Sequence, residues 1–153
     1  MKRIDKVFAY ITHGDKLLIF SHPNHPEAGL QVPAGTVESG ETWREAVLRE
    51  AFEETGLMGL DVVRELGERL YHHEGKSQLH SRRFFHLNYK KTPPQTWERL
   101  EKFGSDGNHH LFRFFWVALD AVPPLVAKHD ALLPLLVVEP VADARANRQH
   151  DEH

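Results

Sequence analysis

The feature that constrains this chain most is a group of acidic side chains inside the stretch Gly35–Leu57, GTVESGETWREAVLREAFEETGL. On a helix of about 100° per residue, Glu53 and Glu54 lie about 60° and 40° to either side of Glu50. The three carboxylates therefore share one arc about 100° wide. An adjoining arc is apolar and can be buried against a core: Val47, Leu48, Ala51 and Phe52. The stretch predicts an amphipathic helix that gathers negative charge on one side.

Three acids this close repel one another, and a like-charge pair four residues apart destabilises a helix by roughly 0.2–0.5 kcal/mol. A hard divalent cation would offset the repulsion, because Mg²⁺ and Mn²⁺ bind carboxylate oxygens. The alternative is a solvated acidic face in which Glu45–Arg49 and Arg49–Glu53 are ordinary i,i+4 ion pairs. The helix alone favours this alternative. The residues around the helix reverse the preference.

Those residues match the pattern G-x5-E-x7-R-E-U-x-E-E-x-G-U, with U apolar, at every defined position: Gly35, Glu41, Arg49, Glu50, Ala51, Glu53, Glu54, Gly56 and Leu57. The pattern is the Nudix box, and the chain resembles a Nudix hydrolase. The resemblance implies a loop–helix–loop that holds divalent metal against a pyrophosphate. It also implies an α/β fold, the Nudix-type α/β/α sandwich with a mixed central sheet. Substrates of the family are usually a nucleoside diphosphate linked to another group.

The same resemblance suggests metal ligands and catalytic residues. Glu50, Glu53 and Glu54 are expected to hold Mg²⁺ or Mn²⁺, with the backbone carbonyl of Gly35 completing the site. Arg49 is expected to orient a box glutamate or to pair with Glu41 across the loop, although its helical direction points somewhat away from Glu50. Glu38, inside the box loop, is an additional outer ligand candidate.

The general base has two candidate positions. In some family members it is the box glutamate that corresponds to Glu53, which we favour here; in others a glutamate from a later loop serves, for which Glu98 and Glu101 are the candidates. Both later glutamates are equally consistent with surface charge.

Substrate-binding candidates outside the box are Arg82, Arg83, Arg113, Glu98 and Glu101. For each strand arginine, an ion pair with a neighbouring carboxylate is the more common explanation. Tyr71, Trp97 and Phe103 could stack on a nucleobase, but large aromatic side chains more often belong to the core.

Composition limits the partners. The chain has 153 residues, 41% hydrophobic residues, a net charge of −3 and no cysteine. These values fit one domain over residues 1–140 with a polar, disordered tail over 141–153 in a reducing cytoplasm. They do not favour nucleic acid or a membrane surface as a partner, and no apolar run is long enough to span a bilayer. A small nucleotide-type substrate is expected, and a homodimer is left open. Twelve histidines are scattered along the chain, and most are interpreted as solvated loop residues.

Local patterns predict the secondary structure around the box. Lys6–Thr12 and Lys16–Phe20 form a hairpin, Thr42 caps the box helix and Gly56 ends it. Further strands are predicted at Gln31–Pro33, Asp61–Leu66, Arg82–Tyr89 and Leu111–Leu119, the last of them central because it is apolar on both faces. Tyr71–Ser81 reads as a loop, and helices are predicted near Trp97–Lys102 and Lys128–Val137.

The substrate stays open at this point. ADP-ribose pyrophosphatases are marked by a proline about 15 residues past the box, which is absent here. Dinucleoside-polyphosphate hydrolases carry a tyrosine for which Tyr71 is only an early counterpart, and the SQPWPFPxS array of NADH pyrophosphatases is absent.

The leading interpretation is a metal-dependent nucleotide pyrophosphohydrolase. The alternative is a Nudix-fold module that binds a nucleotide as a regulatory ligand without turnover, although such modules commonly have a degraded box and this box is intact. An RNA-decapping role is disfavoured by the lack of a basic patch.

Overall fold

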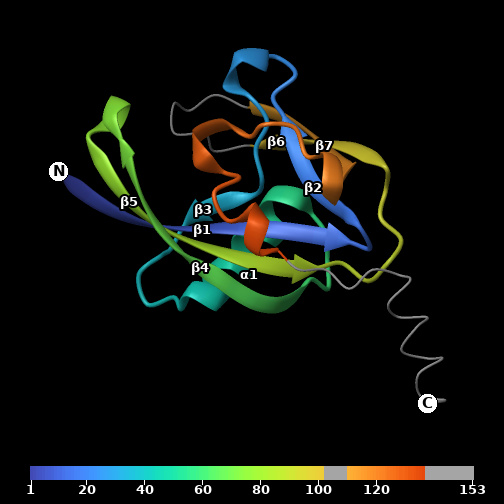
Figure 1. Cartoon of the computed structure of the whole chain (residues 1–153), viewed down its shortest axis with the longest axis horizontal. Coiled ribbons are helices and arrows are strands. Elements are labelled where there is room, and N and C mark those ends of the chain that lie inside the picture. Colours follow the sequence, from blue (N-terminus) through green and yellow to red (C-terminus); the bar gives the residue numbers. More distant parts are fainter. Residues whose placement is uncertain (102–109, 137–153) are drawn as a thin grey trace.

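The computed structural model describes residues 1–101 and 110–136. In that part of the chain, seven strands form one mixed sheet in the order β4-β5-β1-β2-β7-β6, with β3 paired to β1 beside this path (Figure 1). The strands are β1 (Lys2–His13), β2 (Lys16–Ser21), β3 (Ala34–Thr36), β4 (Asp61–His73), β5 (Gln78–Asn88), β6 (Thr96–Glu101) and β7 (His110–Ala118). The predicted fold class, an α/β sandwich around a mixed sheet, is confirmed.

The sheet forks along one edge of β1. β5 runs parallel to β1 from Lys2 to Thr12 and takes up the other edge. The forked edge pairs with β3 near Val7 and with β2 only at its far end, at Thr12 and His13. β2 then leaves to pair with β7, which pairs with β6. The fork creates space between β3 and the β2–β7–β6 part of the sheet.

The helix α1 (Trp43–Thr55) is formed where the box predicted it. Thr42 is its N-cap: the Thr42 hydroxyl accepts from Glu45 N–H at 3.0 Å, and the Glu45 carboxylate accepts from Thr42 N–H at 2.8 Å, which completes a capping box. Gly56 follows in the left-handed conformation, with φ 77°, and its N–H donates to Phe52 O. Both predicted ends of the helix are confirmed.

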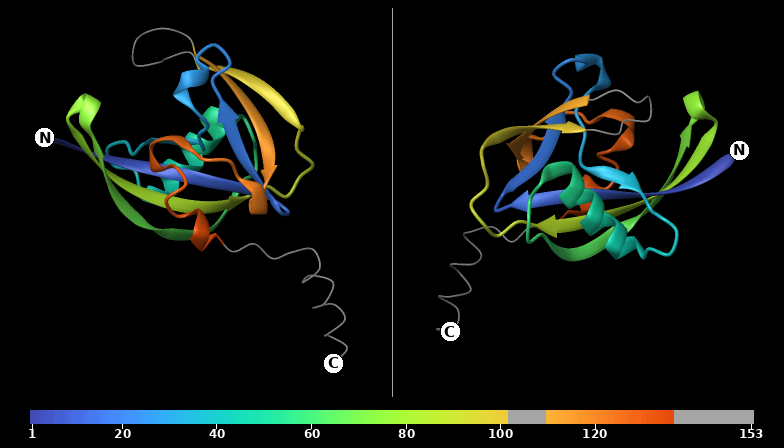
Figure 2. Two further views of the ribbon diagram at one scale, coloured as in Figure 1. Left: turned by 45° about the horizontal axis from the view of Figure 1, so that its top comes forward. Right: turned by 180° about the vertical axis from the view of Figure 1, so that it is seen from behind.

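Side chains of β1 alternate between two cores. Val7, Ala9 and Ile11 lie on the face covered by α1, together with Ala46 and Val47 of the helix. Phe8 and Tyr10 lie on the other face, which the segment 119–136 covers through residues such as Leu125 and Leu132. Figure 2 shows α1 crossing one face of the sheet, while this segment lies over the opposite face in Figure 1. Residues 7–12 in the middle of the sheet are therefore buried on both faces.

The predicted helix at Lys128–Val137 is wrong within the described residues. The described part of that range holds only short 3-10 turns, the end of η4 (Val126–Lys128) and η5 (Leu133–Leu135), and η3 (Leu119–Ala121) precedes them. Ala127 and Lys128 have positive φ values of 52° and 63°, a conformation that no right-handed helix contains. Tertiary bonds hold the segment instead: the Tyr10 hydroxyl donates to His129 O at 2.7 Å, and the hydroxyl oxygen accepts from Leu132 N–H at 3.2 Å.

Two further local predictions are wrong. Of the region predicted as a helix near Trp97–Lys102, the described residues 97–101 belong to the edge strand β6, because Trp97 packs on the core with Phe114 and β7 supplies a ladder of backbone hydrogen bonds. The region Tyr71–Ser81 is mostly strand, since β4 continues to His73 and β5 begins at Gln78. Cross-strand pairing has overridden the polar local composition in both places.

The histidines also differ from expectation in part, because His80, His86 and His129 are buried instead of solvated. His129 Nδ1 accepts from Val32 N–H at 3.2 Å, and burial lowers the pKa of this imidazole to about 3. Each helix within residues 1–101 and 110–136 is too short or too polar to cross a bilayer. The predicted tail, 141–153, lies outside the described residues.

Candidate active site

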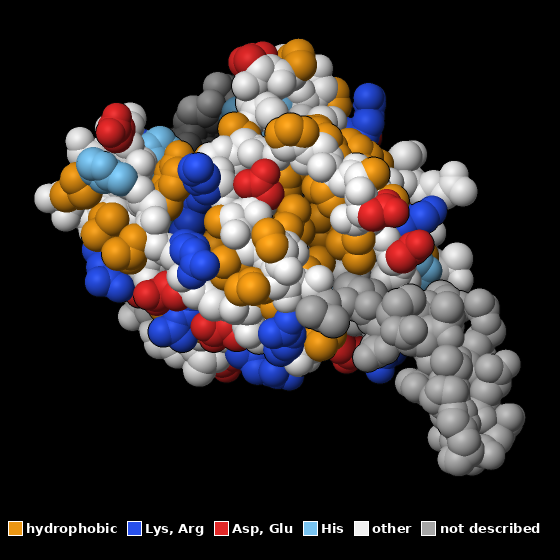
Figure 3. All heavy atoms as spheres, in the orientation of Figure 1, with side chains coloured by type: hydrophobic (Ala, Val, Ile, Leu, Met, Phe, Trp, Pro, Cys, Tyr) orange, Lys and Arg blue, Asp and Glu red, His pale blue; other side chains and the backbone are white. Residues whose placement is uncertain are grey.

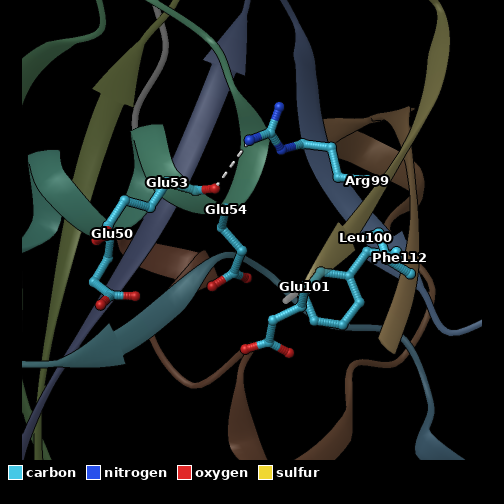
Figure 4. A pocket seen from close by; sticks show the side chains of 7 residues that line it. All are labelled: Glu50, Glu53, Glu54, Arg99, Leu100, Glu101 and Phe112. Atoms are coloured by element: carbon cyan, nitrogen blue, oxygen red, sulfur yellow. Dashed lines mark hydrogen bonds between the residues drawn. The ribbon is translucent and has the colours of Figure 1, made fainter. Parts of the chain in front are cut away.

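The acidic arc of α1 opens into a pocket of about 440 Å³ on the forked side of the sheet. Its lining comes from three elements: Glu50, Glu53 and Glu54 of α1, Arg99, Leu100 and Glu101 of β6, and Phe112 of β7 (Figure 4). Glu54 and Glu101 extend into the same space from opposite walls. The structure therefore brings the three predicted metal ligands together with one of the two later glutamates.

Burial and mutual repulsion shape the electrostatics of this pocket. The pKa of Glu54 is raised well above its ordinary value, first by burial and then by the negative charges of Glu50 and Glu101. The pKa of Glu50 is also raised by burial, which the hydrogen bond from Arg49 partly opposes. Carboxylates in such surroundings are stabilised in the charged form by a nearby cation.

Arg49 is the cation that connects the box residues. Its guanidinium donates to Glu41 at 2.5 and 2.9 Å, to Glu50 at 2.6 Å and to Glu53 at 2.9 Å. A fourth acceptor is the backbone carbonyl of Thr36, at 3.1 Å. The expected contact with Glu41 is present, and hydrogen bonds from Arg49 and from Glu38 N–H lower the pKa of Glu41 to about 2.

The helical direction of Arg49 does not keep its guanidinium from Glu50. Adjacent Cα–Cβ directions diverge on a helix, but the long arginine side chain bends back far enough for Nη1 to reach Glu50 Oε1. Arg49 therefore holds both Glu50 and Glu53 from one guanidinium.

Gly35 lies directly beneath the Glu50 side chain. A β-carbon at position 35 would overlap the carboxyl group of Glu50, so glycine is needed for this approach. β3 brings Gly35 to this position by pairing with Val7 of β1. The box-loop backbone at Gly35 and the carboxylate of Glu50, a candidate metal ligand, are thus adjacent.

The other candidates lie elsewhere. Glu98 is paired with Arg113 at 2.5 Å on the sheet face turned away from α1, because neighbouring residues of a strand alternate between faces. Arg82 also lies on that face, whereas Arg83 stacks on Trp43 and has Glu65 and Glu68 as ion-pair partners. Of the later glutamates, only Glu101 reaches the pocket.

The aromatic candidates have structural partners. Trp97 stacks on Phe114 with ring centroids 5.2 Å apart, and its indole N–H donates to Thr55 O at 2.9 Å. Tyr71 covers the guanidinium of Arg82 at 3.7 Å. Phe103 lies outside the described residues.

Arg99 and Phe112 are pocket residues that the sequence did not single out. Arg99 packs over Gly56 and donates to the backbone carbonyl of Glu53 at 3.3 Å. A signal was present in the chain, because Trp97, Arg99 and Glu101 share one face if Thr96–Glu101 is extended. The assignment of this region to a helix concealed it.

The donor set fits a hard divalent cation in its chemistry. Carboxylate oxygens from Glu50, Glu53, Glu54 and Glu101 surround one pocket, and Mg²⁺ and Mn²⁺ select such ligands. Within residues 1–101 and 110–136, no three acidic or histidine side chains are already gathered into a metal site. Arg49 holds Glu50 and Glu53, so a bound ion would share these carboxylates with the guanidinium.

Known proteins give an independent comparison. Among solved structures, the chain is similar to a MutT NUDIX hydrolase from Burkholderia pseudomallei, with 22% identity, a TM-score of 0.65 and coverage of 90% of this chain and 100% of the other. It is similar to an Ap4A hydrolase from C. elegans, with 17% identity, a TM-score of 0.63 and coverage of 86% and 93%. It is also similar to a UDP-X diphosphatase, with 20% identity, a TM-score of 0.62 and coverage of 88% of this chain and 61% of the other. This chain therefore spans less than two thirds of that protein.

At these identities the structural neighbours establish the fold alone. The family assignment comes from the sequence model of the NUDIX domain, which matches residues 2–136 and so includes the box, the pocket and the whole sheet. The chain belongs to the Nudix hydrolase family.

Proposed function

We propose that this protein is a divalent-metal-dependent hydrolase that cleaves a phosphoanhydride in a nucleoside diphosphate linked to another group. The observation that carries the proposal is the meeting of Glu50, Glu53, Glu54 and Glu101 around one pocket at the fork of the sheet. The substrate class is supported by structural neighbours named for UDP-X and Ap4A. Both names describe compounds with a phosphoanhydride next to a nucleoside.

The metal would be Mg²⁺ or Mn²⁺, held by Glu50, Glu53, Glu54 and the carbonyl of Gly35. When bound, such an ion neutralises phosphate charge and makes water more acidic. Arg49 fixes the directions of Glu50 and Glu53 through its hydrogen bonds at 2.6 and 2.9 Å. The carboxylates are thereby positioned before a substrate enters.

Glu53 is the proposed general base, which takes a proton from the attacking water. Glu53 is exposed at the mouth of the pocket, so water reaches it directly. Glu101 is the second candidate because it extends into the pocket from the opposite wall. Arg99 has no carboxylate partner among the described residues, and its guanidinium is available to a phosphate oxygen of the substrate.

The test is a panel of phosphoanhydrides: nucleoside triphosphates, ADP-ribose, dinucleoside polyphosphates, nucleotide sugars and coenzyme A. Each is incubated with Mg²⁺ or Mn²⁺ and followed by ³¹P NMR in ¹⁸O-labelled water, which identifies the phosphorus atom attacked. Hydrolysis of at least one member only in the presence of metal is expected. Tight nucleotide binding without hydrolysis of any member would instead identify a regulatory binding module.

A further inference from the structure

Arg82 is a buried cation without an acidic partner. It lies on β5, on the sheet face turned away from α1, and only 4% of its surface is exposed. Its Nη1 donates to Ala127 O at 2.5 Å, and its Nη2 lies 3.4 Å from His80 Nδ1. Nε has no hydrogen-bond partner. Within residues 1–101 and 110–136 no carboxylate forms an ion pair with it, and burying an unpaired charge is costly.

Two aromatic rings hold the planar guanidinium in place. The Arg82 Cζ atom lies 3.7 Å from the centre of the Tyr71 ring and 4.7 Å from the centre of the Phe8 ring. Cation–π contacts of this kind stabilise the charge while leaving the edge of the guanidinium free for hydrogen bonds. Arg82 is thus fixed in orientation and still has an unused donor.

Further cations surround Arg82. Lys6 of β1 and Arg69 of β4 are its direct cross-strand partners, so the three side chains form a row on one face of the sheet. Arg69 donates only to the neighbouring Glu68 carbonyl, and neither Lys6 nor Lys128 has an ion-pair partner in the described chain. Like charges in adjacent positions destabilise a sheet unless an anion lies between them.

This row borders a cavity of about 290 Å³ whose lining contains no acidic side chain: Arg69, Leu70, Tyr71, His72, Arg82, Phe84, Lys128 and Ala131. Figure 3 shows lysine and arginine side chains gathered along this face, beside the lobe formed by the β4–β5 hairpin. The cavity therefore combines three cationic side chains with aromatic and aliphatic ones.

Lys6 connects this cavity with the carboxylate pocket. Lys6 is paired with Thr36 of β3, whose carbonyl accepts from Arg49, and the next pair along is Val7 with Gly35. Burial lowers the pKa of Lys6, as do the charges of Lys76 and Arg82, while Glu50 and Glu54 raise it. Lys6 therefore lies between Arg82 of β5 and Thr36 of β3, which pair with opposite edges of β1.

We propose that the cavity is a second anion site, which takes a phosphate or carboxylate group of the substrate remote from the anhydride that is cleaved. This inference rests on the proposed function and adds a substrate class to it: nucleoside diphosphate derivatives that carry an extra anionic group. Arg82 supplies a positioned guanidinium, and Lys128 supplies an exposed ammonium group. The extra group is attached either to the nucleoside or to the second moiety.

The binding arm of the test uses inorganic phosphate as the probe. The Nε–H resonance of Arg82 in ¹⁵N-labelled protein, assigned by its loss in Arg82→Lys, is expected to shift as phosphate is added.

Lys128→Met should weaken phosphate binding by about threefold or more, because one ammonium group is lost. Lys128 is exposed and makes no hydrogen bond through its side chain, so this substitution leaves the packing of the core unchanged. Lys16→Met, an exposed lysine on β2 outside this cavity, is the matched control. A resonance that does not move at millimolar phosphate would overturn the inference.

The kinetic arm uses substrate pairs that differ by one anionic group. Coenzyme A and 3′-dephospho-coenzyme A differ on the nucleoside, while UDP-glucuronate and UDP-glucose differ on the sugar. In one of the pairs, kcat/KM for the more anionic member is expected to be higher by about tenfold, and Lys128→Met should reduce this preference while Lys16→Met preserves it. Hydrolysis with no preference in either pair would overturn the inference and leave the hydrolase. Phosphate binding at Arg82 with no hydrolysis of any phosphoanhydride would overturn the proposed function while the anion site stands.

Discussion

The carboxyl group of Glu50 lies against the α-carbon of Gly35 so closely that a β-carbon at position 35 would overlap it. The two residues are fifteen positions apart and come from β3 and α1. Glu50 is held from the other side by Arg49 at 2.6 Å. Arg49 thus holds Oε1 of Glu50, while Oε2 and the carboxyl carbon lie where a β-carbon of residue 35 would be.

Gly35→Ala is expected to displace the Glu50 carboxylate. The group in the way is the end of a flexible side chain, so the thermal midpoint should change little, while kcat/KM should fall by about tenfold or more as a ligand is misplaced. Gly75→Ala is the control, because a β-carbon there meets only ordinary contacts with His73. Unchanged activity in Gly35→Ala would show that Glu50 acts from more than one position.

Glu50→Gln should weaken Mg²⁺ or Mn²⁺ binding by about tenfold or more and leave the fold intact, since one anionic ligand is lost. Isothermal titration of metal into wild type and variant measures this. Glu74→Gln, at the exposed tip of the β4–β5 hairpin, is a matched loss of charge away from the pocket. Equal metal affinities in wild type and Glu50→Gln would remove Glu50 from the ligand set.

Glu53→Gln should lower kcat by about 10²-fold or more if Glu53 is the general base. Glu98→Gln is the informative control, because Glu98 is paired with Arg113 on the opposite face of the sheet and should leave kcat unchanged. Steady-state kinetics of both variants and of Glu101→Gln decide the assignment. A fast Glu53→Gln enzyme together with a slow Glu101→Gln enzyme would move the base to β6.

Thr42→Ala should lower the free energy of unfolding by about 1 kcal/mol, because the hydroxyl that accepts from Glu45 N–H is lost, while the backbone N–H of residue 42 can still donate to the Glu45 carboxylate. Thr42→Ser retains the hydroxyl and should recover most of this difference. Chemical denaturation measures both. An equally large loss in Thr42→Ser would attribute the effect to the methyl group instead of the cap.

Titration of His129 should lower the free energy of unfolding as the pH drops below 6.5. Burial lowers the pKa of His129 to about 3 in the folded protein, against 6.5 as its ordinary value. Between these values the unfolded chain binds a proton that the folded protein does not, so the free energy of unfolding decreases with falling pH. His80, with a pKa lowered to about 4 by burial and by Arg82, acts in the same direction.

For His129 alone, the decrease from about pH 7.5 to about pH 4.5 should be roughly 2–3 kcal/mol. His129→Asn keeps an acceptor for Val32 N–H but cannot titrate. Denaturant unfolding of wild type and variant across this pH range should give a smaller pH dependence for the variant. The same slope in both proteins would exclude His129 as the titrating group.

The sequence alone determined the features that depend on local interactions. Thr42 and Glu45 cap α1 within one turn, Gly56 ends the helix because it accepts a left-handed conformation, and helical spacing puts Glu50, Glu53 and Glu54 on one arc. The hairpin of β1 and β2 follows from the turn at Gly14, with φ 59°. Each of these features involves residues only a few positions apart, so propensity and periodicity are sufficient to predict them.

The tertiary structure decided the features that depend on distant partners. Glu101 faces the pocket and Glu98 does not, because pairing of β6 with β7 fixes which residues of a strand point to each face. The segment after β7 turns instead of forming a helix, because the Tyr10 hydroxyl takes up its backbone groups. Arg82 and Lys6 are 76 positions apart in sequence, yet the register of β5 against β1 makes them neighbours. Side-chain patterns report which residues prefer burial, whereas the register of a sheet depends on contacts between segments that are far apart along the chain.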